Sequence, residues 1–217
     1  MIVSTGIYYA AALIAAGIAA GWLAGPWFGL PLYLAAAFCL WFFRDPEREI
    51  PSGAGTVAVA PADGKVMAVK PEGREWNRIS IFLNVFDVHV NRTPVAGTIR
   101  DVRYRCGLFL VASKERCSEE NEQNVVTIET PEGSIVVFKQ IAGLIARRIV
   151  FSRKAGETLR LGERIGLMKF GSRMDVLLGR EWEIAVREGQ RVTAGVTVIA
   201  RRRAAEPAAV EAVVHET

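Results

Sequence analysis

The sequence predicts a mainly β domain, a β-sandwich or barrel-sandwich, tied to the membrane by one or two N-terminal helices. Three observations carry this prediction. Residues 1–43 contain no Asp, Glu, Lys, Arg or His. Beyond them the chain becomes a series of short apolar runs separated by Gly, Pro and Asn, and helical periodicity is weak. With 217 residues, 51% of them hydrophobic, the chain has room for one folded domain plus a membrane segment.

Two apolar runs at the N-terminus, residues 7–24 and 27–43, are separated by Gly25-Pro26. A membrane-spanning helix needs about 20 apolar residues, so each run is close to the lower limit. We expect a tight helical hairpin, with one span plus an interfacial stretch as the alternative. A cleaved signal peptide fits less well, because no basic segment follows Met1 and the apolar stretch is too long.

The junction FFRDPEREIP marks the change from the apolar segment to the rest of the chain. Its Arg44 and Arg48 directly follow the second run, and positive residues beside a span favour the cytoplasmic side. We therefore expect a membrane anchor over residues 1–43, a folded domain over 44–203 at the cytoplasmic face, and a tail over 204–217 that lacks a partner strand.

Short apolar runs fill the domain, and their spacing is typical of an antiparallel sandwich or barrel. The expected strands are 56–60, 64–69, 78–83, 97–105, 124–129, 134–140 and 181–186. One short helix is expected near residues 113–121. The segment GQRVTAGVTVIA predicts a strand, a turn and a strand, and it is similar to the hammerhead strands of biotinyl and lipoyl domains. It has no lysine at its tip, so it predicts architecture rather than a carrier site.

The formal net charge of +4 suits an anionic lipid surface. It is too small to indicate nucleic-acid binding, and no nucleic-acid motif accompanies it. The three cysteines show neither CxxC nor metal-ligand spacing, which favours free thiols, with a Cys106–Cys117 disulfide as the alternative. The acidic residues are scattered, so we expect no metal site.

Three polar residues stand out in apolar surroundings: Asp63 in PADGKV, His89 in FDVHVNRTPVAG and Ser172 in KFGSRMDV. Each alone is compatible with a structural role, since Asp-Gly and Gly-Ser are common turns and a lone histidine is often a buried core residue. Only their combination, in this order, is specific.

The combination resembles the short form of phosphatidylserine decarboxylase, over roughly residues 40–202. The motifs that carry the resemblance are FFRDPEREIP, PADGKV, FDVHVNRTPVAG, ENEQN, QIAGLIARRIV and GERIGLMKFGSRMDV. The resemblance implies a proenzyme that cuts itself between Gly171 and Ser172 into a large and a small chain, which stay together as a heterodimer. It leaves a higher homo-oligomer open.

The family's cofactor is a pyruvoyl group, which the resemblance places at Ser172. Loss of CO2 from an amino acid leaves a carbanion, and an electron-sink carbonyl can accept its electrons where a side chain cannot. To form the group, the Ser172 hydroxyl attacks the Gly171 carbonyl, the resulting ester eliminates, and dehydroalanine hydrolyses to pyruvoyl and ammonia. Gly171 favours the attack because it has no side chain and tolerates positive φ.

The resemblance also assigns roles to the other two residues. His89 would take the proton of the Ser172 hydroxyl, which is a weak nucleophile on its own, and Asp63 would orient and support the imidazole. Many relatives have a second histidine in a run like DYHRVHMP, and Arg92 occupies that position here. Whether His89 serves self-cleavage, substrate protonation or both stays open.

Weaker substrate-binding candidates are Arg92, Asn121, Glu122 and Arg173. Arginine binds phosphate well, but each arginine could equally be solvated, and ENEQN could be a polar loop. Arg173 replaces a residue that is Thr in many relatives.

The expected activity is conversion of phosphatidylserine, a membrane phospholipid, to phosphatidylethanolamine and CO2. One alternative is the same mechanism on the ether lipid archaetidylserine. Another is a non-catalytic, membrane-tethered lipoyl-like module that would stay uncut. A pyruvoyl decarboxylase of a soluble amino acid fits the apolar N-terminus poorly.

Overall fold

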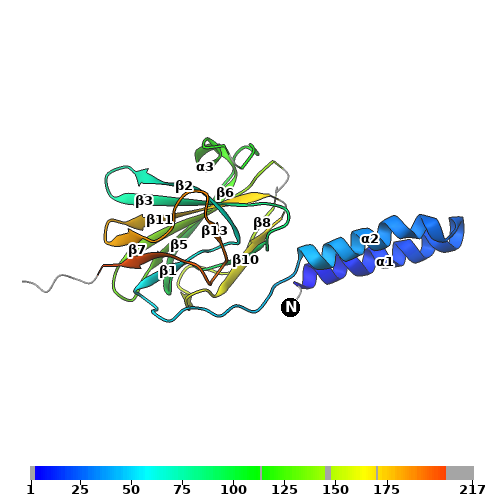
Figure 1. The fold of residues 1–217 in the computed structure, drawn as a ribbon, viewed down its shortest axis with the longest axis horizontal. Helices are drawn as coiled ribbons and strands as arrows, with labels where there is room; N and C mark the ends of the chain where they lie inside the picture. Colours follow the sequence, from blue (N-terminus) through cyan, green and yellow to red (C-terminus); the bar gives the residue numbers. More distant parts are fainter. Residues whose placement is uncertain (1–2, 113, 145–147, 170, 204–217) are drawn as a thin grey trace, which may run out of the picture.

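The computed structural model describes residues 3–112, 114–144, 148–169 and 171–203. A helical hairpin projects from one side of a β domain (Figure 1). Helix α1 covers Ser4–Ala24 and α2 covers Pro26–Phe42. Gly25 makes the turn between them with φ +109°, and Pro26 opens α2, where a missing backbone N–H is tolerated.

Small residues line the contact between the two helices. Gly17 and Gly29 are buried there, and a side chain on Gly29 would collide with the Gly17 carbonyl, so the backbones approach closely. The outward faces are apolar and exposed, as at Trp22 and Trp27. Within the described residues, α1 is the one helix long and apolar enough to cross a membrane, and the 17-residue α2 is shorter. The expected hairpin is present.

The described part of the β domain contains fourteen short strands and one short helix, α3 (Cys117–Glu120). The strands are β1 (Val57–Val59), β2 (Gly64–Glu72), β3 (Trp76–Leu83), β4 (Val90–Arg92), β5 (Gly97–Arg105), β6 (Gln123–Glu129), β7 (Ile135–Ile141), β8 (Ile149–Phe151), β9 (Thr158–Leu159), β10 (Arg164–Met168), β11 (Ser172–Gly179), β12 (Trp182–Ile184), β13 (Arg191–Val192) and β14 (Val198–Arg202).

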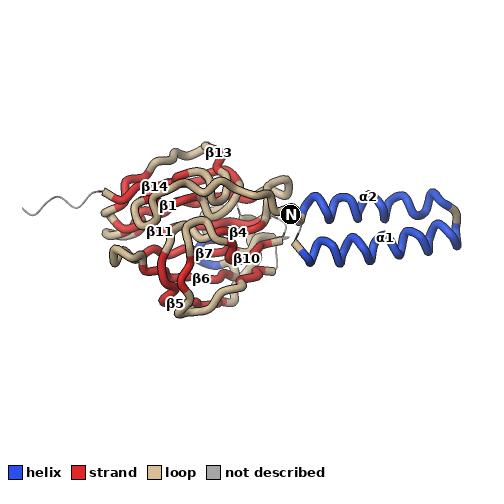
Figure 2. The backbone as a smooth tube through the Cα atoms, turned by 90° about the horizontal axis from the view of Figure 1, so that it is seen from below, coloured by secondary structure: helices blue, strands red, loops and turns tan. Residues whose placement is uncertain are grey.

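These strands form one large antiparallel sheet and two small ones (Figure 2). The eight-stranded sheet has the order β13-β2-β3-β11-β7-β6-β5-β9. The three-stranded sheets have the orders β1-β14-β12 and β4-β10-β8. The predicted mainly β fold with N-terminal apolar helices is therefore confirmed.

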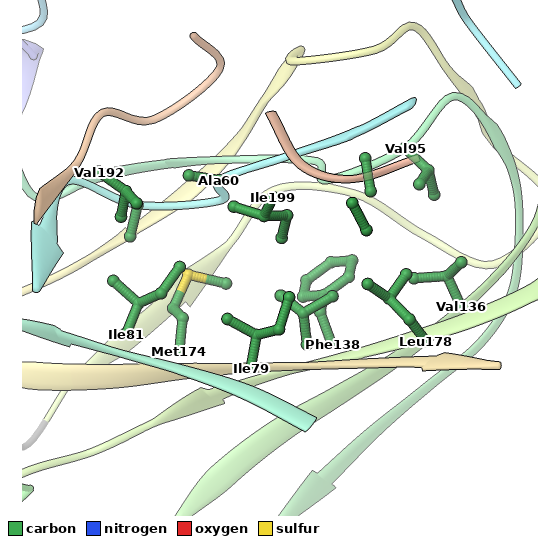
Figure 3. Close-up of a cluster of buried hydrophobic side chains, with 14 of the residues drawn as sticks. Ala60, Ile79, Ile81, Val95, Val136, Phe138, Met174, Leu178, Val192 and Ile199 are labelled. Atoms are coloured by element: carbon green, nitrogen blue, oxygen red, sulfur yellow. The ribbon is translucent and has the colours of Figure 1, made fainter. Parts of the chain in front are cut away.

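The hydrophobic core lies between the large sheet and the segments that cover it (Figure 3). Alternating residues of β3, β7 and β11, including Ile79, Phe138 and Met174, point from the sheet into this layer. Ala60 and Ile199 face them from the opposite side. Burying each large aliphatic side chain contributes about 1.5–3 kcal/mol, so this layer holds the two sides together.

The structure differs from the sequence prediction in several elements. Strands β4, β8, β9, β10 and β11 were not predicted, and the helix expected near 113–121 is limited to α3, with residue 113 outside the described residues. Strands β13 and β14 form where expected, but β13 pairs with β2 while β14 pairs with β1 and β12. The tail expected over 204–217 lies outside the described residues.

As expected, all three cysteines are free thiols. Cys106 is exposed, Cys39 is partly buried and Cys117 is buried.

Candidate active site

Ser172 is the first residue of β11, a strand in the middle of the large sheet. It pairs with Leu83 of β3, and the next residue, Arg173, pairs with Ile141 of β7. Ser172 is fully buried, and its Oγ has no hydrogen-bond partner within the described part of the chain. A buried hydroxyl without a partner is costly, and this one lies at the position where the resemblance predicts the cut.

Gly171 precedes the strand with φ +67°, in the left-handed region that glycine adopts without strain. Its carbonyl packs against Gly143, where any side chain would collide with the Gly171 oxygen. The peptide bond between Gly171 and Ser172 therefore lies at a turn where two backbone segments approach closely, at the position that the sequence predicts to be cut.

His89 lies between β3 and β4, beside this peptide bond, and its side chain is only 2% exposed. Its Nδ1 is 2.8 Å from the carbonyl oxygen of Asp87, so Nδ1 carries the proton and donates it to that carbonyl. Nε2 is then unprotonated and accepts from the backbone N–H of Gly171 at 3.5 Å. The ring of Phe42, at the end of α2, packs against the imidazole with centroids 4.3 Å apart. The basic nitrogen therefore faces the Gly171–Ser172 segment.

Burial lowers the pKa of His89 below its ordinary value, and the carbonyl and carboxylate of Asp87 only partly oppose this. A lowered pKa means that the imidazole is neutral at pH 7. The buried site thus keeps Nε2 unprotonated, as a general base needs, with a long hydrogen bond from the Gly171 N–H as its contact.

We expect the rate of self-cleavage to be level above about pH 6.5 and to fall at lower pH, because protonation of Nε2 removes the base. Since the pKa of His89 is lowered, the midpoint of this fall should lie below 6.5. Newly translated precursor, chased over a pH series and followed on gels, measures the midpoint. A midpoint above 6.5 would contradict the assignment.

Asp63 lies in the turn before β2, and both of its carboxylate oxygens are occupied by other groups. Oδ1 accepts from the backbone N–H of Ala194 at 2.7 Å, and Oδ2 accepts from Arg48 at 2.9 Å. Among the described residues no hydrogen bond joins Asp63 to His89. Asp63 acts on the imidazole through its charge, which raises the pKa of His89 less than Asp87 does.

Asp87 orients His89, and the sequence analysis did not single it out. Its carboxylate is fixed by the backbone N–H of Asn84 at 2.9 Å and by Arg191. The sequence gives little indication of this role, because the contact to the His89 ring comes from the backbone carbonyl of Asp87, two residues before His89.

Arg92 and Asn121 are both buried and hold backbone segments together. Arg92 donates to the carbonyl of Gly162 at 3.0 Å and pairs with Asp45 at 3.4 Å, which ties the linker after α2 to the domain. Asn121 donates to the carbonyls of Leu110 and Ala142 at 2.9 and 2.7 Å. The bond from Asn121 to Ala142 helps to hold the next residue, Gly143, against the Gly171 carbonyl.

Glu122 also joins these two segments, because its backbone carbonyl accepts a hydrogen bond from the backbone N–H of Ala142 at 2.9 Å. Its side chain accepts from the hydroxyl of Tyr104. That contact and burial raise the pKa of Tyr104 to about 12.

Arg173 is 1% exposed and lies in a buried polar network. It donates to Asp175 at 2.6 Å and to Ser80 at 2.7 Å, while Ser118 donates to the other oxygen of Asp175 at 2.7 Å. This burial shows that Arg173 is not a solvated surface residue, and its role as a substrate-binding candidate stays a prediction. Its side chain ties β11 to β3 and to the segment around α3.

We expect Asp175→Ala to destabilise the fold by about 3–5 kcal/mol, because it leaves the Arg173 charge buried without its partner. Thermal unfolding in detergent measures the change. The control is Asp101→Ala, which removes an exposed pair with Arg103 that should be worth under about 1 kcal/mol. Equal losses for the two variants would contradict the structural role of the network.

The arrangement brings together an electrophile, a nucleophile and a base. The Gly171 carbonyl, the buried Ser172 hydroxyl and the neutral His89 imidazole belong to neighbouring segments of one sheet end. Within the described residues Ser172 Oγ makes no hydrogen bond to His89, whose Nε2 accepts from the Gly171 N–H instead. No cluster of three or more potential metal ligands occurs among the residues that the structure describes.

Comparison with known proteins gives consistent matches. A family model described as phosphatidylserine decarboxylase matches residues 35–200. A phosphatidylserine decarboxylase proenzyme of Solibacter usitatus is 69% identical over 201 residues, which are 93% of this chain and 97% of that protein. Proenzymes of the same name from Magnetococcus marinus and Nitrosomonas eutropha are 44% and 49% identical, over 88% and 85% of this chain and 91% and 85% of theirs.

Proposed function

Because the chain belongs to the phosphatidylserine decarboxylase family, we propose that it converts phosphatidylserine to phosphatidylethanolamine and CO2 with a pyruvoyl group made from its own Ser172. The observation that carries this proposal is the buried Ser172 hydroxyl, which lacks a hydrogen-bond partner in the described structure and follows a left-handed glycine. Once formed, the pyruvoyl carbonyl supplies the electron sink for the carbanion that CO2 loss creates.

Self-processing begins with the groups described above. Nε2 of His89 takes the proton of the Ser172 hydroxyl while Oγ attacks the Gly171 carbonyl. The peptide bond is thereby exchanged for an ester, and elimination of that ester separates the chain after Gly171. The printed name of the relatives, proenzyme, supports such a step.

The cut leaves the two pieces joined as a heterodimer. Strand β11 begins at Ser172 and is paired along its length with β3 on one side and with β7 on the other. Its residues from Ser172 to Leu178 are all buried. The small chain therefore starts inside the sheet, where non-covalent contacts hold it.

The N-terminal hairpin suits a membrane anchor over residues 1–43, with the catalytic domain over 44–203. A two-chain lipid leaves a bilayer with difficulty, since each buried CH₂ contributes about 0.8 kcal/mol, so the enzyme must come to its substrate. Arg44 and Arg48 directly after α2 favour the cytoplasmic face.

The substrate is taken to be the ester lipid, because the relatives' names specify phosphatidylserine. An activity assay with phosphatidylserine and archaetidylserine side by side tests this choice.

The decisive test of the pyruvoyl mechanism is the intact mass of the purified protein. We expect two chains divided between Gly171 and Ser172, with the smaller one lighter than its simple hydrolysis product by one ammonia. A single uncut chain, stable in detergent and lipid, would favour a non-catalytic membrane-tethered module.

We expect Asp63→Asn to slow self-cleavage several-fold, because it removes a negative charge that supports the imidazolium formed when His89 accepts a proton. The effect should be smaller than that of replacing His89, since no hydrogen bond links the two described side chains. Pulse-chase conversion measures the rate, with Asp101→Asn on the exposed part of β5 as control. An unchanged rate would remove Asp63 from the processing machinery.

A further inference from the structure

Three connections of the large sheet emerge at the end where Ser172 lies. Strand β3 ends at Leu83, which pairs with Ser172. Strand β7 ends at Ile141, which pairs with Arg173 on one side and with Gln123, the start of β6, on the other. The described residues 84–89, 106–112, 114–122 and 142–144 therefore share this end of the sheet with the cleavage site.

These three connections carry four large apolar side chains that face solvent. They are Phe86, Leu108, Val111 and Leu144, with exposures of 66%, 53%, 42% and 53%. The described part of the domain after residue 43 has seven such exposed side chains. Scattered ones are normal on a soluble surface, but four at one end of one sheet indicate a partner.

The same end is joined to the membrane hairpin. The Phe86 ring packs edge-on against Trp41 near the end of α2, with centroids 6.0 Å apart. Arg44 donates to the carbonyl of Phe86 at 2.8 Å, and Lys169, just before the cleavage site, donates to the Tyr9 hydroxyl of α1 at 3.2 Å. In Figure 1 the hairpin leaves the domain on the side that carries β8 and β10.

The connections are also tied to one another. Asn121 bonds both backbone groups of Leu110 and the carbonyl of Ala142, so the segments that carry Leu108 and Leu144 move as one unit. Apolar side chains that are already held in place lose little conformational entropy when they bind, which suits a flat apolar partner.

We propose that an apolar rim, formed by Phe86, Leu108, Val111 and Leu144, is a lipid-docking surface that seats the Ser172 end of the sheet in the same bilayer that holds α1 and α2. The proposal rests on the proposed function, in which the substrate is a membrane lipid. The bilayer is favoured over a protein partner because Phe86 of the rim packs against Trp41 of the apolar hairpin. Arg44 and Lys169 at the junction add positive charge suited to anionic headgroups. The headgroup then reaches the buried site without the lipid leaving the membrane.

The first test measures the depth of spin labels on the full-length protein in vesicles of phosphatidylethanolamine, phosphatidylglycerol and phosphatidylserine. Labels replace Phe86, Leu108 or Leu144 in a background with Cys39 and Cys106 changed to Ser. The control label replaces Glu132, in the turn at the opposite end of β7 from Leu144. Seven residues of β7 at about 3.3 Å each place this control about 23 Å farther from the rim.

We expect rim labels to be shielded from a water-soluble nickel chelate and accessible to oxygen, and the Glu132 label to be open to the chelate. Rim labels as accessible to nickel as the control would overturn the proposal. The measurement needs no turnover. Shielded labels on a protein without decarboxylase activity would therefore fault the proposed function and leave the docking surface standing.

The second test uses the double variant Leu108→Glu/Val111→Glu. Turnover of phosphatidylserine in vesicles should fall about tenfold or more, since two apolar side chains no longer enter the lipid. Self-cleavage, and turnover of a short-chain phosphatidylserine dissolved as monomers, should be unchanged. The control is Val196→Glu, between β13 and β14 and outside the three connections. Equal losses on both lipids, or no loss on vesicles, would overturn the proposal.

Discussion

Ser172→Ala yields one uncut chain of full length with no decarboxylase activity. The variant lacks the hydroxyl that attacks the Gly171 carbonyl, and it also lacks the atoms from which the pyruvoyl group is made. Both losses should be complete rather than partial. Intact mass and release of CO2 from phosphatidylserine measure them in the same preparation.

The fold of this variant should survive, because Ser172 Oγ has no hydrogen-bond partner among the described residues and its removal leaves no other group unsatisfied. The thermal midpoint should therefore equal or exceed that of the wild-type precursor. Ser134→Ala, in the turn between β6 and β7, is the matched control and should be cut normally. A cut Ser172→Ala chain would place the reaction at another residue.

His89→Ala should accumulate as the uncut precursor, with self-cleavage slowed by about 10²- to 10⁴-fold, the usual contribution of a general base. The physical reason is the position of Nε2, which is unprotonated and lies beside the Gly171 amide. Pulse-chase gels or the half-time of conversion after translation measure the loss.

His89→Gln separates basicity from packing. Its amide can keep a polar contact to the Asp87 carbonyl, but it offers no basic nitrogen. We expect it to remain uncut, as His89→Ala does. Normal conversion of either variant would remove His89 from self-processing and leave it only a role toward the substrate.

Much of the fold could be predicted from local patterns, because strands such as β6 and β7 alternate buried and partly exposed residues. Strand β11 escaped the prediction for the opposite reason. It is buried on both faces, so it shows no alternation, and it contains Arg173 and Asp175. Their spacing of two residues places both on one face of a strand, where they pair. The exposed pair of Asp101 and Arg103 in β5 has the same spacing, so the spacing alone does not predict that Arg173 is buried.

The candidate site was partly predictable. Ser172, Gly171 and His89 were found from their motifs, and the structure brings all three together. Asp63 lies nearby but is bonded to Arg48 and Ala194 instead. The orientation of His89 depends on the Asp87 carbonyl, and the packing of the Gly171 carbonyl depends on Gly143. Such backbone contacts depend on the tertiary fold, so the pattern of side chains in the sequence does not predict them.

The central position of β11 in the large sheet affects how the protein folds and refolds. The sheet must assemble while residues 171 and 172 are still linked, because the strand that begins at Ser172 is threaded between β3 and β7. Before the cut, the linker holds this strand at a high effective concentration near its partners. Afterwards, a denatured molecule would have to reassemble from two separate chains, in a reaction that depends on protein concentration. If the chain is cut as proposed, renaturation becomes bimolecular, and the mature molecule would persist through slow unfolding rather than by repeated renaturation.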